Sequence, residues 1–575
     1  MNAKLPKFLR TPASKRAIQV AIAASLTMGA VVHTAPARAD VVEDVAATAA
    51  AVVTVAANAV AQTAQAAYQF WAYRDEPGNY SAWSSFWNLF FPPAVDKPLS
   101  TGNNQWGYST IPSIPSQINR QNYYAWQTVK VPLSSGAACA DGSEYKFFVN
   151  LTNASNNFLI WQQGGGSCSD YAGCSGRQAL LNPDGSWKRD AEGNQQEGEF
   201  QATIINMNGI PDNFMDVFGN LFAGKRELGW LYAPFLNRLA ILDPHRVKLQ
   251  DWNIIAMPYC TGDSHMGENN AVLTRVDGKK TMVHRFNGNK NVLVALGWLR
   301  DNLPRPAQVF LTGQSAGALG TEWHRATVRK ILNPSDSLYS MPDSGHIGGD
   351  DPTGQLDVAK YPAAMFINDV KTHWWGHDPS KATPSTFIAN ATKEIPGFDI
   401  KDTTNMSSLI SRLHPQDRIT YLSAISDMNF GNYGYKHNPE YIQAAIASGD
   451  VNLKHAPAHF SPIGNYIRKN WNQELDFHVK RIEQLTPNQG YFFPSGRRLN
   501  ESHTIASLTY EGSVNGDTGH TVLDAIENLI DRRRPPVLRE KESDQTRGLY
   551  LPLGPNTQAA IALGGSDDII NPPLN

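Results

Sequence analysis

Residues 309–320 of the chain read VFLTGQSAGALG. The first four are apolar or β-branched and predict a short buried strand. Residues 313–317 (GQSAG) match G-x-S-x-G, the pattern of a nucleophile elbow, in which a sharp turn between a strand and a helix presents a serine. Such a turn strains the backbone of Ser315 and crowds the positions two residues away, so small residues are needed there. Residues 318–332 can form the following helix, whose N-terminal amides favour negative charge near Ser315.

The chain has 575 residues, enough for one large domain or two of ordinary size. Its formal net charge is -2, with no basic stripe that would favour nucleic acid and no acidic block typical of a disordered tail. Aromatic residues make up 10% of the chain, including 14 Trp, which indicates a large hydrophobic core. We therefore expect a globular protein that does not bind nucleic acid.

The N-terminus has the pattern of an export signal. A basic region is followed by a mostly apolar run over residues 17–32 and by the A-x-A site at residues 37–39. The alternative is a membrane anchor, but Gln19, Ser25 and Thr27 interrupt the run. We expect cleavage before Asp40 and a secreted or periplasmic protein, of a type found in bacteria. No later stretch of about 18 uninterrupted apolar residues predicts a membrane span.

Four segments are predicted along the chain: a signal peptide (1–39), an N-terminal extension (40–120), a catalytic domain (121–536) and a C-terminal tail (537–575). In the extension, residues 41–67 are rich in Ala and Val and predict a helix. Residues 68–93 are dense in aromatic side chains, which either pack on the main domain or grip a sugar or lipid. The tail is polar and contains Pro and Gly without strong periodicity.

From about residue 121 the pattern alternates between strands and helices. Alternation of this kind predicts an α/β fold with a mostly parallel sheet and helices on both faces, and together with the elbow it predicts an α/β-hydrolase. Strands are predicted at residues 145–151, 158–162, 253–258 and 419–425, and helices at residues 291–302 and 521–529.

A serine needs a base, an orienting acid and an oxyanion hole before its hydroxyl becomes a useful nucleophile. Residues 161–167 (WQQGGGS) run from a predicted strand into three glycines, whose backbone N–H groups can turn toward an oxyanion. We assign the hole to the amides of Gly166, Ser167 and Ala316. A five-letter match to the elbow can arise by chance, but the flanking strand and helix favour the elbow. In an α/β-hydrolase the acid and then the histidine follow the serine.

Several landmarks, taken in order, resemble the pectin acetylesterases and the Notum-type carboxylesterases. The resemblance spans roughly residues 139–530. It is carried by CADGS at residues 139–143, GGGSC at 164–168, the strand ending in PYCTGD at 258–263, the elbow at 313–317 and DSG at 343–345. It implies a carboxylesterase of the α/β-hydrolase fold that needs no cofactor and acts on O-acetyl groups of a polysaccharide or on a longer acyl chain.

The resemblance also implies roles for particular residues. Asp427 resembles the family's acid after a late strand, while Asp343 belongs to a motif that looks structural and Asp417 precedes the strand. His503 resembles the family's histidine loop. Its competitor is His520, at the start of a helix whose positive end would lower the basicity of the ring.

Four Cys in an exported chain fit two disulfides. The family pattern implies the pairs Cys139–Cys260 and Cys168–Cys174. The chain also departs from that pattern, because Ser167 stands where the family usually has Trp, which predicts a wider pocket beside the reacting carbonyl. In addition, Ala318 replaces a Gly, and no cysteines flank His503.

His373 and His377 are spaced as metal ligands could be, but the residues Trp-Trp-Gly between them disfavour a regular helix. We interpret this segment as an aromatic loop near the site and expect no metal.

The sequence thus predicts a secreted serine esterase with Ser315, His503 and Asp427 as catalytic triad. The alternatives are a lipase or polyester depolymerase and, from another class, a non-catalytic binding protein on a hydrolase scaffold. The oligomeric state is left open.

Overall fold

The computed structural model describes residues 111–543, apart from residues 185, 201–205, 207–208, 213, 216–247, 347, 426, 448–461, 486, 496–502, 509–514 and 532–536. The chain divides into the units Met1–Ala61 and Gln62–Asn575, and all described residues belong to the second. The predicted signal peptide, the Ala-rich and aromatic-rich segments of the extension, and the tail from residue 544 onward lie outside the described residues.

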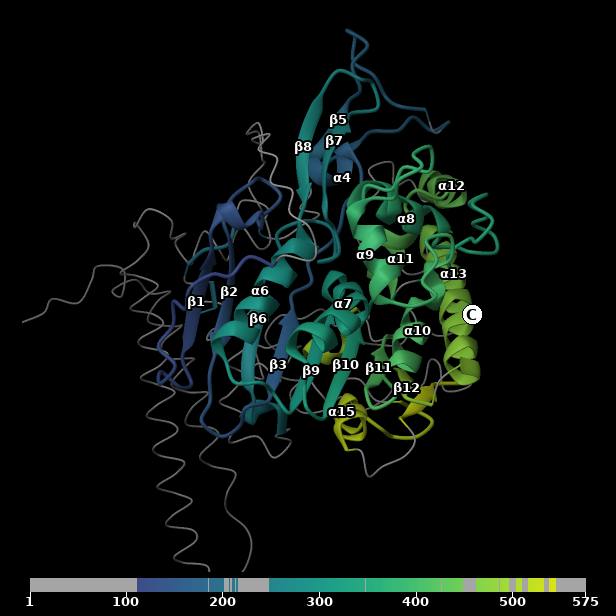
Figure 1. Ribbon diagram of the computed structural model, residues 1–575. Coiled ribbons are helices and arrows are strands. Elements are labelled where there is room, and N and C mark those ends of the chain that lie inside the picture. Colours follow the sequence, from purple (N-terminus) through teal and green to yellow (C-terminus); the bar gives the residue numbers. More distant parts are fainter. Residues whose placement is uncertain are drawn as a thin grey trace, which may run out of the picture. The chain divides into compact units, whose positions relative to one another are not determined.

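Within the described part, nine strands form one sheet in the order β1-β2-β6-β3-β9-β10-β11-β12-β13 (Figure 1). Strands β1 and β2 are antiparallel to their neighbours, and every pair from β6 to β13 is parallel. The predicted α/β-hydrolase fold with its mostly parallel sheet is confirmed. The strands are β1 (Trp126–Val131), β2 (Tyr145–Asn150), β3 (Phe158–Gln162), β6 (Asn253–Met257), β9 (Gln308–Gln314), β10 (Ser337–Asp343), β11 (Arg418–Leu422), β12 (Gln489–Phe493) and β13 (Arg539–Lys541).

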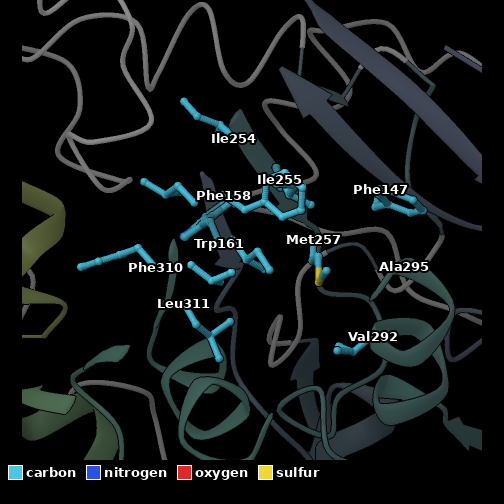
Figure 2. Packing of buried hydrophobic residues seen from close by; sticks show 14 of the residues in the cluster. Phe147, Phe158, Trp161, Ile254, Ile255, Met257, Val292, Ala295, Phe310 and Leu311 are labelled. Atoms are coloured by element: carbon cyan, nitrogen blue, oxygen red, sulfur yellow. The ribbon is translucent and has the colours of Figure 1, made fainter. Parts of the chain in front are cut away.

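The central strands form because they are short apolar runs that are covered on both faces, as parallel strands usually are. All residues of β3 and β6 are buried, and only Gln308 of β9 is partly exposed. Figure 2 shows their side chains packing together with Phe147 of β2 and with Val292 and Ala295 of the helix α6 (Gly288–Asn302). This packing forms the main hydrophobic core. The elbow strand is longer than predicted by one residue at its start and two at its end.

Helices cover both faces of the sheet. On β11 and β12 alternate side chains point to opposite sides. Leu422 and Phe492 pack with the helix α15 (Val522–Ile530), whereas Tyr421 and Tyr491 belong to a second core with α7 (Ala316–Leu332), α10 (Met406–Leu413) and α13 (Pro462–Leu485). The remaining helices are α4 (Tyr171–Ser175), α8 (Ala364–Asp369), α9 (Thr386–Glu394), α11 (Met428–Tyr435), α12 (Pro439–Ala447) and α14 (Ile505–Leu508), with short 3-10 turns at Leu133–Ser135, Lys248–Asp251 and Thr403–Asn405.

Two antiparallel hairpins lie outside the main sheet: β4 (Arg177–Ala179) with β5 (Glu197–Phe200), and β7 (Asn269–Thr274) with β8 (Thr281–Phe286). They are linked, because the amide of Gln195 donates to Asp277 and Lys279 donates to Asn194. No helix among the described residues is both long enough and apolar enough to cross a membrane.

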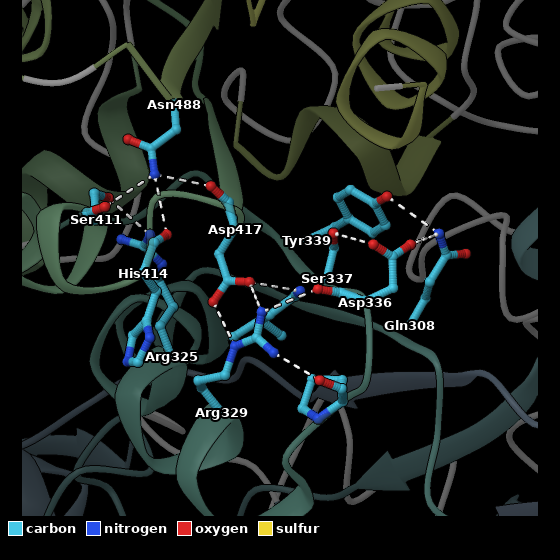
Figure 3. A network of polar contacts seen from close by, with 12 residues as sticks. Gln308, Arg325, Arg329, Asp336, Ser337, Tyr339, Ser411, His414, Asp417 and Asn488 are labelled. Atoms are coloured by element: carbon cyan, nitrogen blue, oxygen red, sulfur yellow. Dashed lines mark hydrogen bonds and ion pairs between the residues drawn. The ribbon is translucent and has the colours of Figure 1, made fainter. Parts of the chain in front are cut away.

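A buried ion pair fastens the ends of the strands that lie opposite the elbow. Arg329, near the end of α7, donates through Nε to Asp417 Oδ2 at 2.9 Å and also contacts Oδ1 through a terminal nitrogen (Figure 3). Asp417 also accepts the amide of Leu338 at 2.9 Å, and its carbonyl accepts the side chain of Asn488. One carboxylate therefore joins α7, β10 and the residue before β11, and Asp417 precedes that strand, as predicted.

We predict that Arg329→Ala lowers the free energy of unfolding by about 3–5 kcal/mol, because it leaves the Asp417 carboxylate buried without its charge partner. Urea unfolding followed by tryptophan fluorescence measures the change. The matched control is Lys381→Ala, which breaks the exposed pair with Asp378 and should cost at most about 1 kcal/mol. Equal effects of the two substitutions would contradict the structural role of the buried pair.

Candidate active site

Ser315 occupies a strained turn between β9 and α7. Its backbone has φ 54° and ψ -121°, a region that residues with side chains rarely adopt. The close packing predicted for the elbow is present. A Cβ on Gly313 would lie 2.5 Å from the Gln162 carbonyl oxygen, and one on Gly317 would overlap that same carbonyl. Gln314 and Ala316 are buried, whereas Ser315 is partly exposed, so the turn presents the serine and hides its neighbours.

The glycine-rich loop lies directly against the elbow. A Cβ on Gly164 would overlap the Gln314 carbonyl and lie 3.1 Å from the Cβ of Ser315. Gly165 and Gly166 have positive φ values of 147° and 77°, which are accessible to glycine and not to ordinary residues. The loop predicted to carry the oxyanion hole, with Gly166 and Ser167, therefore follows a strand that is paired with the elbow strand. The proposal that the amides of Gly166, Ser167 and Ala316 form the oxyanion hole stays a prediction.

The segment after β6 holds this loop in place. The Gln163 side chain accepts the amide of Tyr259 at 3.1 Å, and His265 Nε2 donates to the Gln163 carbonyl at 2.8 Å. Burial lowers the pKa of His265 to about 3, only partly opposed by that hydrogen bond, so the ring is neutral. Neither role is visible from the sequence alone. His265 lies two residues beyond the PYCTGD landmark, and no local pattern distinguishes it.

Both disulfides of the structure also border this region. Cys139 is joined to Cys260, and Cys168 to Cys174, which are the two pairs that the family resemblance implied. The second closes a short loop directly after the glycines. Among the described residues, Cys168, Cys174 and His284 come close enough to hold a metal ion, but both sulfurs are used in the disulfide. His373 and His377 are not part of this group.

Between His373 and His377, two buried tryptophans pack beside the glycine-rich loop and in the second hydrophobic core. Residues Val370–Trp374 form a π-helical turn rather than a regular α-helix. The Trp374 indole is fully buried and donates to the Cys168 carbonyl at 2.7 Å, while Trp375 stacks on Phe387. Trp374 therefore lies beside the glycine-rich loop, and Trp375 packs in the second hydrophobic core.

The structure brings Asp427 and His503 together. His503 Nδ1 lies 2.8 Å from Asp427 Oδ2 and 3.1 Å from Oδ1. Asp427 is fully buried and also accepts the amide of Phe430 at 2.8 Å, as the N-cap of α11. Since Asp427 follows β11 and His503 follows β12, both leave the sheet at the edge where β9 ends in Ser315.

His520 lies elsewhere. Its side chain is 47% exposed, and its Nδ1 contacts Glu540 Oε1 at 2.6 Å. The residue precedes Thr521, which is the N-cap of α15 and forms a capping box with Asp524. His520 thus pairs with β13 and not with Asp427.

The family model described as Pectinacetylesterase matches residues 242–382. Among curated proteins, pectin acetylesterase 7 of Arabidopsis thaliana is 25% identical over 234 residues, covering 40% of this chain and 48% of the relative. Pectin acetylesterase 11 of the same plant is 26% identical over 258 residues, covering 44% and 52%. Over this part of its length, the chain is similar to the pectin acetylesterases.

The predicted resemblance is thereby confirmed, and the chain spans about half the length of the curated pectin acetylesterases it matches. Among solved structures, the Wnt deacylase Notum from Drosophila is similar at 13% identity and a TM-score of 0.40, over 72% of this chain and 96% of that one.

A cluster that sequence reasoning missed links the disulfide loop to the helices behind it. His437, just after α11, lies with Nδ1 2.6 Å from Asp369 and with Nε2 3.5 Å from Asp170, the N-cap of α4. Ser169 also donates to Asp369. Burial lowers the pKa of His437, but the two carboxylates outweigh that effect and raise it to about 9, against a smaller repulsion from Lys436. His437 is therefore protonated at neutral pH.

We predict that His437 makes stability depend on pH. Because its pKa is raised on folding, its contribution is complete below the unfolded value of about 6.5 and is lost as pH rises through about 9. The stability difference between the wild-type protein and His437→Gln should therefore be largest near pH 6 and should disappear by about pH 10. Urea unfolding across this range measures it. A difference that does not change with pH would refute the charged cluster.

Proposed function

We propose that this chain is an exported serine esterase that cleaves carboxylic esters through an acyl-serine intermediate. The observation that carries the proposal is the Asp427–His503 pair, held at the same edge of the sheet as the strained Ser315. The relatives named pectin acetylesterase support an O-acetylated carbohydrate as the substrate class. The glycine-rich loop supports acyl transfer, since its backbone packs against the elbow at Gly164, beside the serine, where an oxyanion hole would need backbone donors.

The proposed chemistry uses only this chain's own residues. Asp427 accepts the Nδ1–H of His503, which leaves Nε2 as the nitrogen that takes the proton from Ser315. Ser315 Oγ attacks the ester carbonyl, and the amides of Gly166, Ser167 and Ala316 stabilise the oxyanion. His503 then returns the proton to the departing alcohol, and the acyl-serine forms. Water, deprotonated by His503, releases the carboxylic acid and regenerates the serine.

We predict that Ser315→Ala and His503→Ala each lower the rate of p-nitrophenyl acetate hydrolysis by on the order of 10⁴- to 10⁶-fold, with little change in the thermal unfolding midpoint. The double variant should lose little more than either single one, because members of a triad act as a unit. His520→Ala, the matched control, should keep most of the activity. Wild-type turnover by Ser315→Ala would contradict the proposal. If His520→Ala lost the activity and His503→Ala kept it, His520 would be the base.

The identity of Ser167 predicts activity on acetyl esters that extends to longer acyl groups. Trp374 lies behind the loop, anchored on Cys168, and we expect space beside Ser167 that the family's Trp would fill. A p-nitrophenyl ester series from acetate to laurate should show activity extending to medium chains. Ser167→Trp should reduce activity on the longer esters by about tenfold or more relative to acetate.

Strict acetate preference in the wild-type protein would reject the wider pocket. Higher activity on an insoluble polyester or long-chain triglyceride than on acetylated pectin would favour a lipase or polyester depolymerase instead.

A further inference from the structure

The Asp343–Ser344–Gly345 segment at the end of β10 touches the elbow. Asp343 and Ser344 are fully buried. The Asp343 carbonyl accepts the amide of Ser315 at 2.8 Å, and a Cβ on Gly345 would lie 2.6 Å from the Ser315 carbonyl oxygen. The Ser344 amide donates to the Leu422 carbonyl at 2.7 Å, at the end of the strand that leads to Asp427. The backbone of this segment therefore fixes the elbow relative to the strand of the proposed acid.

The side chains of the same segment hold the residues that follow His503. Ser344 Oγ accepts the amide of Thr504 at 2.7 Å. The two carboxylate oxygens of Asp343 accept the amides of Ile505 at 3.0 Å and Ala506 at 2.8 Å. Three successive backbone amides, those of residues 504–506, thus donate hydrogen bonds to two neighbouring side chains. Ser344 Oγ also donates to Asp343 Oδ1 at 2.9 Å, so the two groups form one unit.

The backbone shows that these contacts impose a particular geometry. Ser315, Ser344 and Thr504 all have positive φ, at 54°, 57° and 57°. Such conformations are strained and persist where surrounding contacts determine them. The residue directly after His503 is therefore held in a conformation that its hydrogen bond to Ser344 supports.

We propose that Asp343 and Ser344 are positioning residues, which set the place and orientation of His503 relative to Ser315. The proposal rests on the proposed esterase function. A displacement of about 1 Å in a catalytic group can cost on the order of 10²-fold in rate, so an anchor on three amides beside the base has a direct kinetic consequence. The His503 ring also lies near enough to Asp343 to act on that carboxyl electrostatically, lowering its pKa against the larger effect of burial.

Glu474 supplies a matched control. This buried carboxylate of α13 likewise accepts two backbone amides, those of Gly349 at 2.8 Å and Ala363 at 3.1 Å, but it does not hold the His503 loop. Burial raises the pKa of both carboxyl groups to about 7, against their hydrogen bonds. Asp343→Asn and Glu474→Gln therefore make the same chemical change in similar surroundings.

The experiment compares kcat, KM and the unfolding midpoint for wild type, Asp343→Asn, Ser344→Ala and Glu474→Gln. We expect Asp343→Asn to lower kcat by about 10²-fold with KM little changed, because an Asn side chain has one acceptor oxygen and cannot accept the amides of both Ile505 and Ala506. Ser344→Ala should lower kcat by about tenfold. Glu474→Gln should shift the unfolding midpoint and leave kcat as in wild type.

The inference is overturned if Asp343→Asn matches Glu474→Gln, with a lower midpoint but an unchanged kcat. If Asp343→Asn does not fold, Ser344→Ala decides, because it removes the acceptor of the Thr504 amide and one hydrogen bond to Asp343 but leaves the Asp343 carboxylate in place. Wild-type kcat in that folded variant overturns the proposal. Failure of the esterase proposal would look different, since the wild-type protein itself would then not hydrolyse p-nitrophenyl acetate.

Discussion

The backbone conformation of Ser315 is the constraint on which the rest of the site depends. A residue with φ 54° at the end of a buried parallel strand persists only where the neighbouring chain can approach very closely. Glycine at positions 313 and 317 permits that approach, since a Cβ at either position would collide with the Gln162 carbonyl. The glycine-rich loop can then lie on the elbow, and the proposed nucleophile and the proposed oxyanion donors become neighbours because of the same close packing.

The parallel sheet explains how distant residues reach this place. Strands β3, β9, β10, β11 and β12 are adjacent and parallel, so their carboxyl ends lie along one edge. Each strand leads into one part of the proposed site. In the same order, these parts are the glycine-rich loop, Ser315, the Asp343 segment, Asp427 and His503. The opposite ends are fastened separately by the buried pair of Arg329 with Asp417. Stability and proposed chemistry are therefore divided between the two edges, as is common in open α/β sheets.

The parts of the site that depend on local sequence could be predicted. The elbow and the glycine loop are short patterns whose steric requirements are visible in the residues themselves, and the alternation of apolar strands and helices indicated the fold. The choice between His503 and His520 was different. Both follow the serine, and residues alone do not say which ring comes within 2.8 Å of Asp427, a contact across 76 positions. The family resemblance favoured His503, and the position of His520 at the positive end of a predicted helix was an argument against His520.

Other contacts left no signal in the sequence. The carboxylate of Asp343 accepts the amide of Ile505, which is 162 positions away in the chain. Because the donor is a backbone amide, this hydrogen bond does not require a particular side chain at position 505, and the sequence therefore carries no sign of it. The pairing of His437 with Asp170 and Asp369 joins single residues from three separate segments. Strand β13, three charged residues at the sheet edge, lacks the apolar pattern of a buried strand.

The central claim is that Ser315 is an activated nucleophile, and covalent labelling measures that property directly. A fluorophosphonate reacts with a serine that an adjacent base has activated, and mass spectrometry of the intact protein and of its peptides locates the adduct. We expect one adduct per chain, on the peptide that contains Ser315, and none on the Ser315→Ala variant. An unlabelled wild-type protein, or an adduct that persists on another residue in the variant, would contradict it.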